Sequence, residues 1–125
     1  MGKKQANWVP ERGDIIYINH SPQAGIEVPG EHPLLVCSTK IFHERTSVVI
    51  GFPMTHAAYN ADNPFALAVK GPKNEVGYVL THQPKSFDWR ERGARPHPWG
   101  GGHSKVLAAA LEKLDAICGI CGIDA

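Results

Sequence analysis

Residues 25–38 read Gly25-Ile26-Glu27-Val28-Pro29-Gly30-Glu31-His32-Pro33-Leu34-Leu35-Val36-Cys37-Ser38. The glycines and prolines of residues 25–33 are typical of a loop, and the apolar residues 34–38 predict a buried strand directly after it. Loops on a rigid scaffold often carry binding and catalytic groups. The Glu27 carboxylate and the His32 imidazole are therefore candidates to face one pocket. The alternative is a solvated surface loop with ordinary charges.

The segments on both sides of this stretch predict four more short strands. Runs of β-branched and aromatic residues between turn residues place these strands at residues 15–18, 46–52, 65–70 and 75–80. Five short strands followed by one helix predict a mainly β fold with α, a small antiparallel barrel capped by a C-terminal helix.

The helix is expected at residues 103–118. Its apolar residues Leu107, Leu111 and Leu114 recur at helical spacing. Ser104 fits the N-cap position, and Gly119 fits the stop. Earlier in the chain, residues 87–92 favour a short helical turn.

The composition limits the class of protein. At 125 residues the chain has the length of one domain, with enough core to fold without disulfides or metals. Its 13 Lys and Arg against 12 Asp and Glu give a net charge of +1, which excludes a polybasic, histone-like protein but permits a local RNA site. The sequence contains no recognisable signal peptide or membrane-spanning run. We expect a soluble cytoplasmic protein without a membrane partner.

Two further motifs carry little functional weight. Cys118-Gly119-Ile120-Cys121 is a CxxC pair, but no second Cys/His pair at zinc-finger spacing accompanies it. We interpret it as a helix end followed by a tail. Residues 96–102 are rich in proline and glycine but lack the strand and the Lys-Ser/Thr pair of a phosphate loop. We therefore expect neither a metal nor a cofactor.

Several segments, taken together and in order, resemble a known family. The most specific are Pro10-Glu11-Arg12-Gly13-Asp14-Ile15 and Gln83-Pro84-Lys85-Ser86-x-Asp88-Trp89-Arg90-x-Arg92. Between them lie Pro22-Gln23-Ala24-Gly25-x-Glu27, Gly30-x-x-Pro33-Leu34-Leu35-Val36 with Ser38, and Pro53-x-Thr55. Over residues 8–118 the chain resembles the MazF/PemK toxins of type II toxin–antitoxin systems. Residues 1–7 are expected to form a flexible tail, and residues 119–125 a C-terminal tail.

The resemblance implies a fold and an activity. Members of this family are small SH3-like barrels that form homodimers and cleave single-stranded mRNA at short motifs without a metal, which inhibits translation and growth. Cleavage uses the 2′-hydroxyl and leaves a 2′,3′-cyclic phosphate and a 5′-hydroxyl. A cognate antitoxin of the MazE/PemI kind neutralises the toxin, and operator DNA is bound only through the antitoxin.

The resemblance also implies site residues. Thr55 matches the family's active-site threonine, and Glu27 matches the glutamate of its first long loop. His32 stands where the family has an arginine, directly before the proline of the second strand. The catalytic candidates are therefore His32, Thr55 and Glu27. The RNA-binding candidates lie in the surrounding loops and strand ends: His20, Ser21, His56, His82, Gln83, Lys85 and Ser86.

The exchange of arginine for His32 leaves two outcomes open. An arginine is always protonated and can bind a phosphate with two parallel hydrogen bonds, whereas a histidine has one switchable proton. In the first outcome His32 serves as acid or phosphate donor, while Glu27 or a second imidazole, such as His20, His56 or His82, serves as base. In the second, the chain is a catalytically weakened homologue that binds RNA or sequesters an antitoxin.

Overall fold

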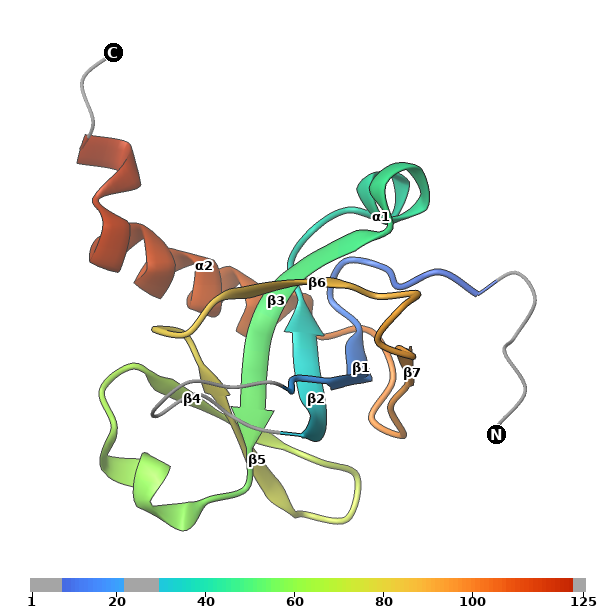
Figure 1. Ribbon diagram of the computed structural model, residues 1–125. Coiled ribbons are helices and arrows are strands. Elements are labelled where there is room, and N and C mark those ends of the chain that lie inside the picture. Colours follow the sequence, from blue (N-terminus) through green and yellow to red (C-terminus); the bar gives the residue numbers. More distant parts are fainter. Residues whose placement is uncertain (1–7, 22–29, 123–125) are drawn as a thin grey trace.

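The computed structural model describes residues 8–21 and 30–122 (Figure 1). The expected tail at residues 1–7, the loop residue Glu27 and the last three residues lie outside this part of the chain. In chain order the elements are β1 (Ile15–Asn19), β2 (Glu31–Val36), α1 (Lys40–Thr46), β3 (Val48–Thr55), η1 (Ala58–Asp62), β4 (Ala66–Lys70), β5 (Val76–Leu80), β6 (Lys85–Asp88), β7 (Arg95–Pro96), α2 (Ser104–Cys118) and η2 (Ile120–Gly122).

The described strands form one antiparallel sheet in the order β4-β5-β3-β2-β1-β7. β3 connects its two parts, because residues 48–51 pair with β6 and Met54 and Thr55 pair with β5. Gly51 allows β2 to approach closely here, since a Cβ at this position would lie 2.4 Å from the backbone oxygen of Leu35. The mainly β fold with a C-terminal helix is confirmed. The sheet is barrel-like but open, because β4 and β7 are not paired with each other in the described residues.

Alternating side chains of the strands build a hydrophobic core on each face of the sheet. α2 runs along one of these faces (Figure 1). The core beneath α2 contains Ile15, Leu35, Phe52, Met54, Val69, Val79, Leu107 and Ala110. The second core contains Ile16, Ile18, Leu34, Val36, Val49, Phe87 and Trp89. Each fully buried aliphatic or aromatic side chain contributes about 1.5–3 kcal/mol, so the two cores fix the position of every strand that carries a candidate site residue.

α1 is a helix that the sequence patterns do not predict, and His43 attaches it to the rest of the fold. The buried ring of His43 donates from Nδ1 to the Pro10 carbonyl at 2.7 Å, and its Nε2 lies 2.5 Å from Ser38 Oγ. The Trp89 indole donates to the His43 carbonyl at 3.0 Å. Burial lowers the pKa of His43, so the ring is neutral near pH 7. His43 is therefore a structural histidine.

Several predicted boundaries are wrong. The strand expected at residues 46–52 is β3, Val48–Thr55, so it continues through Pro53 to Thr55. β2 begins at Glu31, so His32 and Pro33 belong to a strand and not to the preceding loop. α2 begins at Ser104, and its N-cap is His103. The helical turn expected at residues 87–92 is also wrong. Phe87 belongs to strand β6, because its side chain packs into the second core, and only a tight turn follows Asp88.

The C-terminal end of α2 is as expected. Gly119 has φ +65° and donates its N–H to the Asp115 carbonyl, which closes the helix. Cys118 and Cys121 are exposed free thiols, and the described residues contain no cluster of potential metal ligands. Among the same residues, no helix combines the length and apolar character needed to cross a membrane.

Candidate functional site

His32 and Thr55 lie near the ends of neighbouring strands. Ile18 pairs with His32 across β1 and β2, and the β2–β3 pairing ends at Leu34 and Pro53. His32 is two residues from Leu34, and Thr55 is two residues from Pro53. Because side chains alternate along a strand, both project from the face of the second core. Both side chains are half-buried, so they lie where this core reaches solvent.

The Thr55 hydroxyl is held at the start of the loop after β3. Its Oγ1 accepts a hydrogen bond from the Ala57 N–H at 3.2 Å. Accepting this bond leaves the hydroxyl hydrogen available as a donor. Thr55 can therefore donate to a phosphoryl oxygen without rearrangement of the loop.

His20 lies beside His32 and is almost fully buried. Its ring centroid is 6.1 Å from that of His32 and 4.9 Å from that of Phe87. Neither ring nitrogen makes a well-formed hydrogen bond among the described residues, although a backbone group of His32 beside the ring partly opposes the lowering of its pKa. Burial first, and then the positive charges of His32, Lys85 and Arg92, lower the pKa of His20 to about 4. His20 is therefore a neutral imidazole whose polar atoms have been removed from water.

Lys85 and Ser86 are neighbours in β6 but project to opposite faces. Lys85 alternates with Phe87 on the face of the second core, close enough to His20 to lower its pKa. Ser86 pairs with Ile50 on the other face, and both are exposed. The structure therefore groups Lys85 with the His20–His32–Thr55 face and separates Ser86 from it.

Arg92 holds the chain where it enters the loop between β1 and β2. Its Nη1 donates to the Asn19 carbonyl at 3.0 Å and also to the Ser21 carbonyl. The Gly30 N–H in turn donates to Ser21 Oγ at 2.8 Å. Ser21 thus has a structural role in joining the two ends of this loop, and Arg92 supplies a second positive charge beside His20.

His82 and Gln83 form a separate polar pair in the turn after β5. His82 Nε2 and Gln83 Nε2 lie 3.4 Å apart, and the His82 ring lies 5.5 Å from that of Phe65. His82 Nδ1 and Gln83 Oε1 are buried without a hydrogen-bond partner in the described chain. Such groups are costly to bury, so this turn is a candidate for ligand contact.

His56 follows Thr55 and fixes its own tautomer. Its Nδ1 lies 2.9 Å from the Val76 carbonyl, which can only accept, so Nδ1 carries the hydrogen and the neutral ring presents Nε2 as an acceptor. Burial first, and then the nearby His56 charge, lower the pKa of His32. The site therefore combines two imidazoles, one hydroxyl and the cations Lys85 and Arg92.

This arrangement can perform proton transfer on a phosphodiester without a metal. Imidazoles are suited to general acid–base catalysis, and the hydroxyl and the cations can stabilise negative charge on phosphoryl oxygens. Over residues 11–118 the sequence matches the family described as PemK-like, MazF-like toxin of type II toxin–antitoxin system. The chain belongs to this family.

Individual relatives agree with the family assignment. The chain is 32% identical to the endoribonuclease toxin MazF of Escherichia coli K12 over 89 residues, which cover 71% of this chain and 78% of that protein. It is 30% identical to the endoribonuclease PemK of Escherichia coli over 87 residues, which cover 68% of this chain and 65% of that protein.

Solved structures extend the similarity to the fold. The crystal structure of MazF (Form-I) from Deinococcus radiodurans is similar, with a TM-score of 0.80 and 31% identity over 90% of this chain and 99% of that chain. A MazE–MazF crystal structure (Form-II) from the same organism has a TM-score of 0.76 and 31% identity, over 90% of this chain and 98% of that chain.

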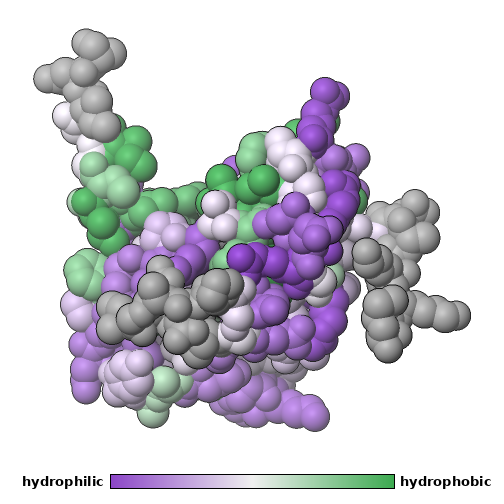
Figure 2. All heavy atoms as spheres, viewed as in Figure 1, coloured by the Kyte–Doolittle hydropathy of each residue, from purple (hydrophilic) through white to green (hydrophobic). Residues whose placement is uncertain are grey.

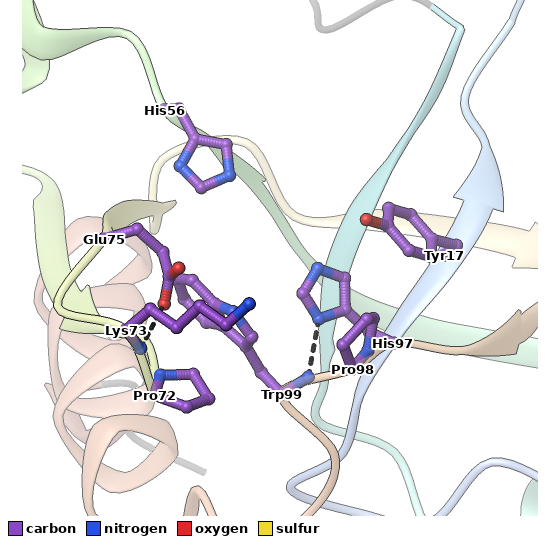
Figure 3. Close-up of a pocket in the computed structure, with 8 residues that line it drawn as sticks. All are labelled: Tyr17, His56, Pro72, Lys73, Glu75, His97, Pro98 and Trp99. Atoms are coloured by element: carbon purple, nitrogen blue, oxygen red, sulfur yellow. Dashed lines mark hydrogen bonds between the residues drawn. The ribbon is translucent and has the colours of Figure 1, made fainter.

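Sequence reasoning missed a pocket that adjoins the site of this MazF/PemK-family chain (Figure 3). The pocket has a volume of about 310 Å³ and lies between β1, the β4–β5 turn and the segment after β7. His56 belongs to both the pocket and the site. No local motif could have revealed the pocket, because its walls come from four distant segments, the three named above and His56 after β3. The lining residues are Tyr17, His56, Pro72, Lys73, Glu75, His97, Pro98 and Trp99.

Proposed function

We propose that the protein is the toxin of a type II toxin–antitoxin system and acts as a metal-independent endoribonuclease on single-stranded mRNA, cutting at a short motif. The placement of His32 and Thr55 on one face, near the ends of β2 and β3 and next to His56, carries this proposal. Family membership and the endoribonuclease names of the E. coli relatives support it. Cleavage of mRNA would inhibit translation and growth in the cytoplasm.

The reaction is a transesterification within the RNA. His56 Nε2 takes the proton of the 2′-hydroxyl, the 2′-oxygen forms a bond to phosphorus, and the bond from phosphorus to the 5′-oxygen breaks. Protonated His32 gives its proton to the leaving 5′-oxygen. The products are a 2′,3′-cyclic phosphate and a 5′-hydroxyl. Thr55 and Lys85 stabilise the charge on the phosphoryl oxygens.

The protonation of His32 follows from substrate binding. In the free protein, burial and His56 keep the pKa of His32 below its ordinary value. A phosphate group beside the ring favours the imidazolium and raises the pKa again. His32 therefore takes up the proton that it later donates, whereas an arginine in this position would be permanently charged.

A second candidate function rests on the same residue. Because its pKa is lowered, His32 offers less positive charge to RNA than an arginine. This observation favours a weakened homologue that binds RNA or sequesters an antitoxin without efficient cleavage. The His32→Arg variant separates the two cases, because a large gain in cleavage would identify the natural protein as a weakened toxin and a loss would identify His32 as the working acid.

We also propose a MazE/PemI-like antitoxin as the protein partner. The similar Deinococcus radiodurans MazF was crystallised with MazE. The antitoxin would occupy the same face as RNA, which makes inhibition competitive, and it would supply the contact with operator DNA. Glu27 remains a proposed active-site residue from the family resemblance.

The exposed apolar residues support a homodimer. Ile117 is 45% exposed and Ile120 is 52% exposed at the end of the C-terminal helix, and Ile50 is 37% exposed on β3. Figure 2 shows hydrophobic side chains gathered along the end of this helix. Large exposed apolar side chains grouped in this way are typical of association surfaces.

End-group analysis of the RNA products tests the proposed activity. Purified protein is incubated with a long single-stranded RNA in EDTA, and the fragments are examined by mass spectrometry. We expect 2′,3′-cyclic phosphate and 5′-hydroxyl ends at a recurring short motif. A DNA strand of the same sequence is the matched control, because without a 2′-hydroxyl it should remain intact. Cleavage of both strands, or of neither, would contradict the proposed chemistry.

A further inference from the structure

The pocket beside His56 combines aromatic walls with polar groups (Figure 3). The Trp99 ring lies edge-on to the rings of His97 and His56, with centroids 5.4 Å and 6.0 Å apart. The Tyr17 ring lies 4.5 Å from that of His97. At about 310 Å³ the pocket is at the lower end of the range of about 300–1,000 Å³ typical of ligand sites. Its size suits a small planar group.

The hydrogen bonds around the pocket fix what it offers a ligand. The backbone N–H of Trp99 donates to His97 Nδ1 at 3.0 Å. The hydrogen of the neutral His97 ring is therefore on Nε2, which is a donor. His56 presents the opposite tautomer, with Nε2 as an acceptor. Figure 3 shows the Tyr17 hydroxyl directed toward the same space. The pocket therefore holds a fixed donor, a fixed acceptor and a hydroxyl that can act as either.

The backbone of the β4–β5 hairpin is shaped to hold Trp99. A Cβ at Gly71 would lie 2.3 Å from Trp99 Cζ2, and one at Gly77 would lie 3.3 Å from Trp99 Cη2. Glycine at these positions lets the indole pack closely against the hairpin. Trp99 is therefore a fixed wall of the pocket.

The charges at the rim argue against a phosphate as the pocket's ligand. Lys73 is the cation of the lining set, and Glu75 is beside it, with Glu75 Oε1 accepting from the Lys73 backbone N–H at 2.9 Å. A lysine with a neighbouring carboxylate gives little net attraction for an anion. Aromatic walls with a donor and an acceptor match a nucleobase, which has a flat π-face and a polar edge.

The pocket adjoins the position of the proposed cleavage. Tyr17 and Ile18 are consecutive in β1, and they pair with Pro33 and His32. On the other side, His56 directly follows Thr55. Tyr17 projects from the opposite face to His32, so the two places meet at the strand ends through His56, which lines the pocket and is close enough to His32 to affect its pKa. A nucleotide with its phosphate at His32 and Thr55 would extend its base past His56 toward Tyr17 and Trp99.

We propose that this pocket binds the base of one of the two nucleotides that flank the cleaved phosphodiester, and so helps to set the RNA motif. This inference rests on the proposed endoribonuclease function. The phosphate is then bound by the cations on one face of the sheet, while the base is read on the other face, beneath Trp99. Tyr17, Lys73 and Trp99 are the specificity residues, and they take no part in proton transfer.

Cleavage of matched RNAs tests the assignment. The substrates differ only in the nucleotide on either side of the cut. We expect Trp99→Ala, Tyr17→Phe and Lys73→Met to reduce the preference between the best and the worst base at one position at least about fivefold, mainly through KM. Tyr17→Phe and Lys73→Met keep the apolar parts of their side chains and should therefore fold. They test the assignment even if Trp99→Ala does not fold. Lys105→Met, a change at an exposed lysine outside the pocket, should keep the wild-type preference.

A binding measurement separates this inference from the proposed activity. The probes are the four nucleoside monophosphates AMP, GMP, CMP and UMP and a 2′-O-methyl oligonucleotide that cannot be cut, observed through the Trp99 indole and His97 ring resonances. We expect one of the nucleotides, and the oligonucleotide, to shift these resonances even in a preparation that does not cleave RNA. Cleavage with unchanged base preference in all three variants would overturn the inference and leave the activity intact. Binding of N-acetyl-tryptophanamide and of no nucleotide would identify a peptide pocket and also overturn it.

Discussion

The ring of His20 lies edge-on to that of His32, with 6.1 Å between their centroids, yet neither ring nitrogen of His20 makes a well-formed hydrogen bond within the described chain. A polar side chain buried in this way lowers stability unless it is compensated. Burial and the nearby charges of His32, Lys85 and Arg92 lower the pKa of the ring to about 4 and so keep it neutral. The neutral ring fills the space behind His32 without adding a further positive charge.

Replacing His20 with phenylalanine should stabilise the protein. The new ring would pack against Phe87, whose ring lies 4.9 Å away, and would remove two unpaired buried nitrogens. We expect the free energy of unfolding to rise by about 1–2 kcal/mol at pH 8 in urea denaturation. His103→Phe is the matched control. It should destabilise the protein, because His103 Nε2 is bonded to the Trp99 carbonyl at 2.9 Å.

The stability of the wild-type protein should fall as the pH falls from about 6.5 to 4. In this range the unfolded His20, with an ordinary pKa of 6.5, binds a proton that the folded ring, with a pKa of about 4, does not bind. This difference between the pKa values of the folded and unfolded states lowers the free energy of unfolding by at most about 3 kcal/mol. His20→Phe should show a shallower decline in urea midpoints measured at successive pH values. An equal decline in both proteins would contradict the burial of a neutral His20.

The two arginines that follow Trp89 should respond differently to lysine substitution. A lysine at position 92 could not bind the Asn19 and Ser21 carbonyls at the same time in the way the guanidinium does. Among the described residues, the Arg90 guanidinium makes one hydrogen bond of 3.4 Å, to the Glu44 carbonyl, and lies over the Trp89 ring, away from this loop. We expect Arg92→Lys to speed hydrogen exchange at the Ser21 amide and to weaken RNA binding. Arg90→Lys should change the exchange rate little. Equal effects of the two variants would contradict the role assigned to Arg92.

His43 should matter for stability and not for cleavage. His43→Ala would remove the bonds to Pro10 and Ser38 and leave a cavity behind α1. The free energy of unfolding should fall by about 2–4 kcal/mol. Under conditions where the variant is folded, its cleavage rate per folded molecule should equal that of wild type. A selective loss of cleavage would move His43 into the site.

The sequence patterns predicted the parts of the fold that local chemistry determines. β1, β3 and β5 are runs of β-branched and apolar residues between turn residues, and Gly119 ends α2 through a left-handed conformation. α1 escaped prediction because its seven residues, about two turns, are mostly exposed and depend on the tertiary contacts of His43. β7 has only two residues, too few for any periodicity.

The candidate site was predictable only in part, for a related reason. The family resemblance identifies His32 and Thr55 by their positions relative to Pro33 and Pro53. The strand pairing next to them places both side chains on one face of the sheet. The separation of Ser86 from Lys85 depends on the β6 register, which is set by Phe87 in the second core. The Trp99 pocket depends on long-range packing, which a local motif does not encode.

The single-turnover rate of RNA cleavage in EDTA by His32→Ala, compared with the wild-type protein, tests the central claim most directly. Circular dichroism and urea unfolding establish first that the variant is folded. If His32 supplies the proton for the leaving 5′-oxygen, the rate should fall at least about 100-fold. Cleavage by His32→Ala at the wild-type rate, with the same cyclic-phosphate ends, would contradict the account.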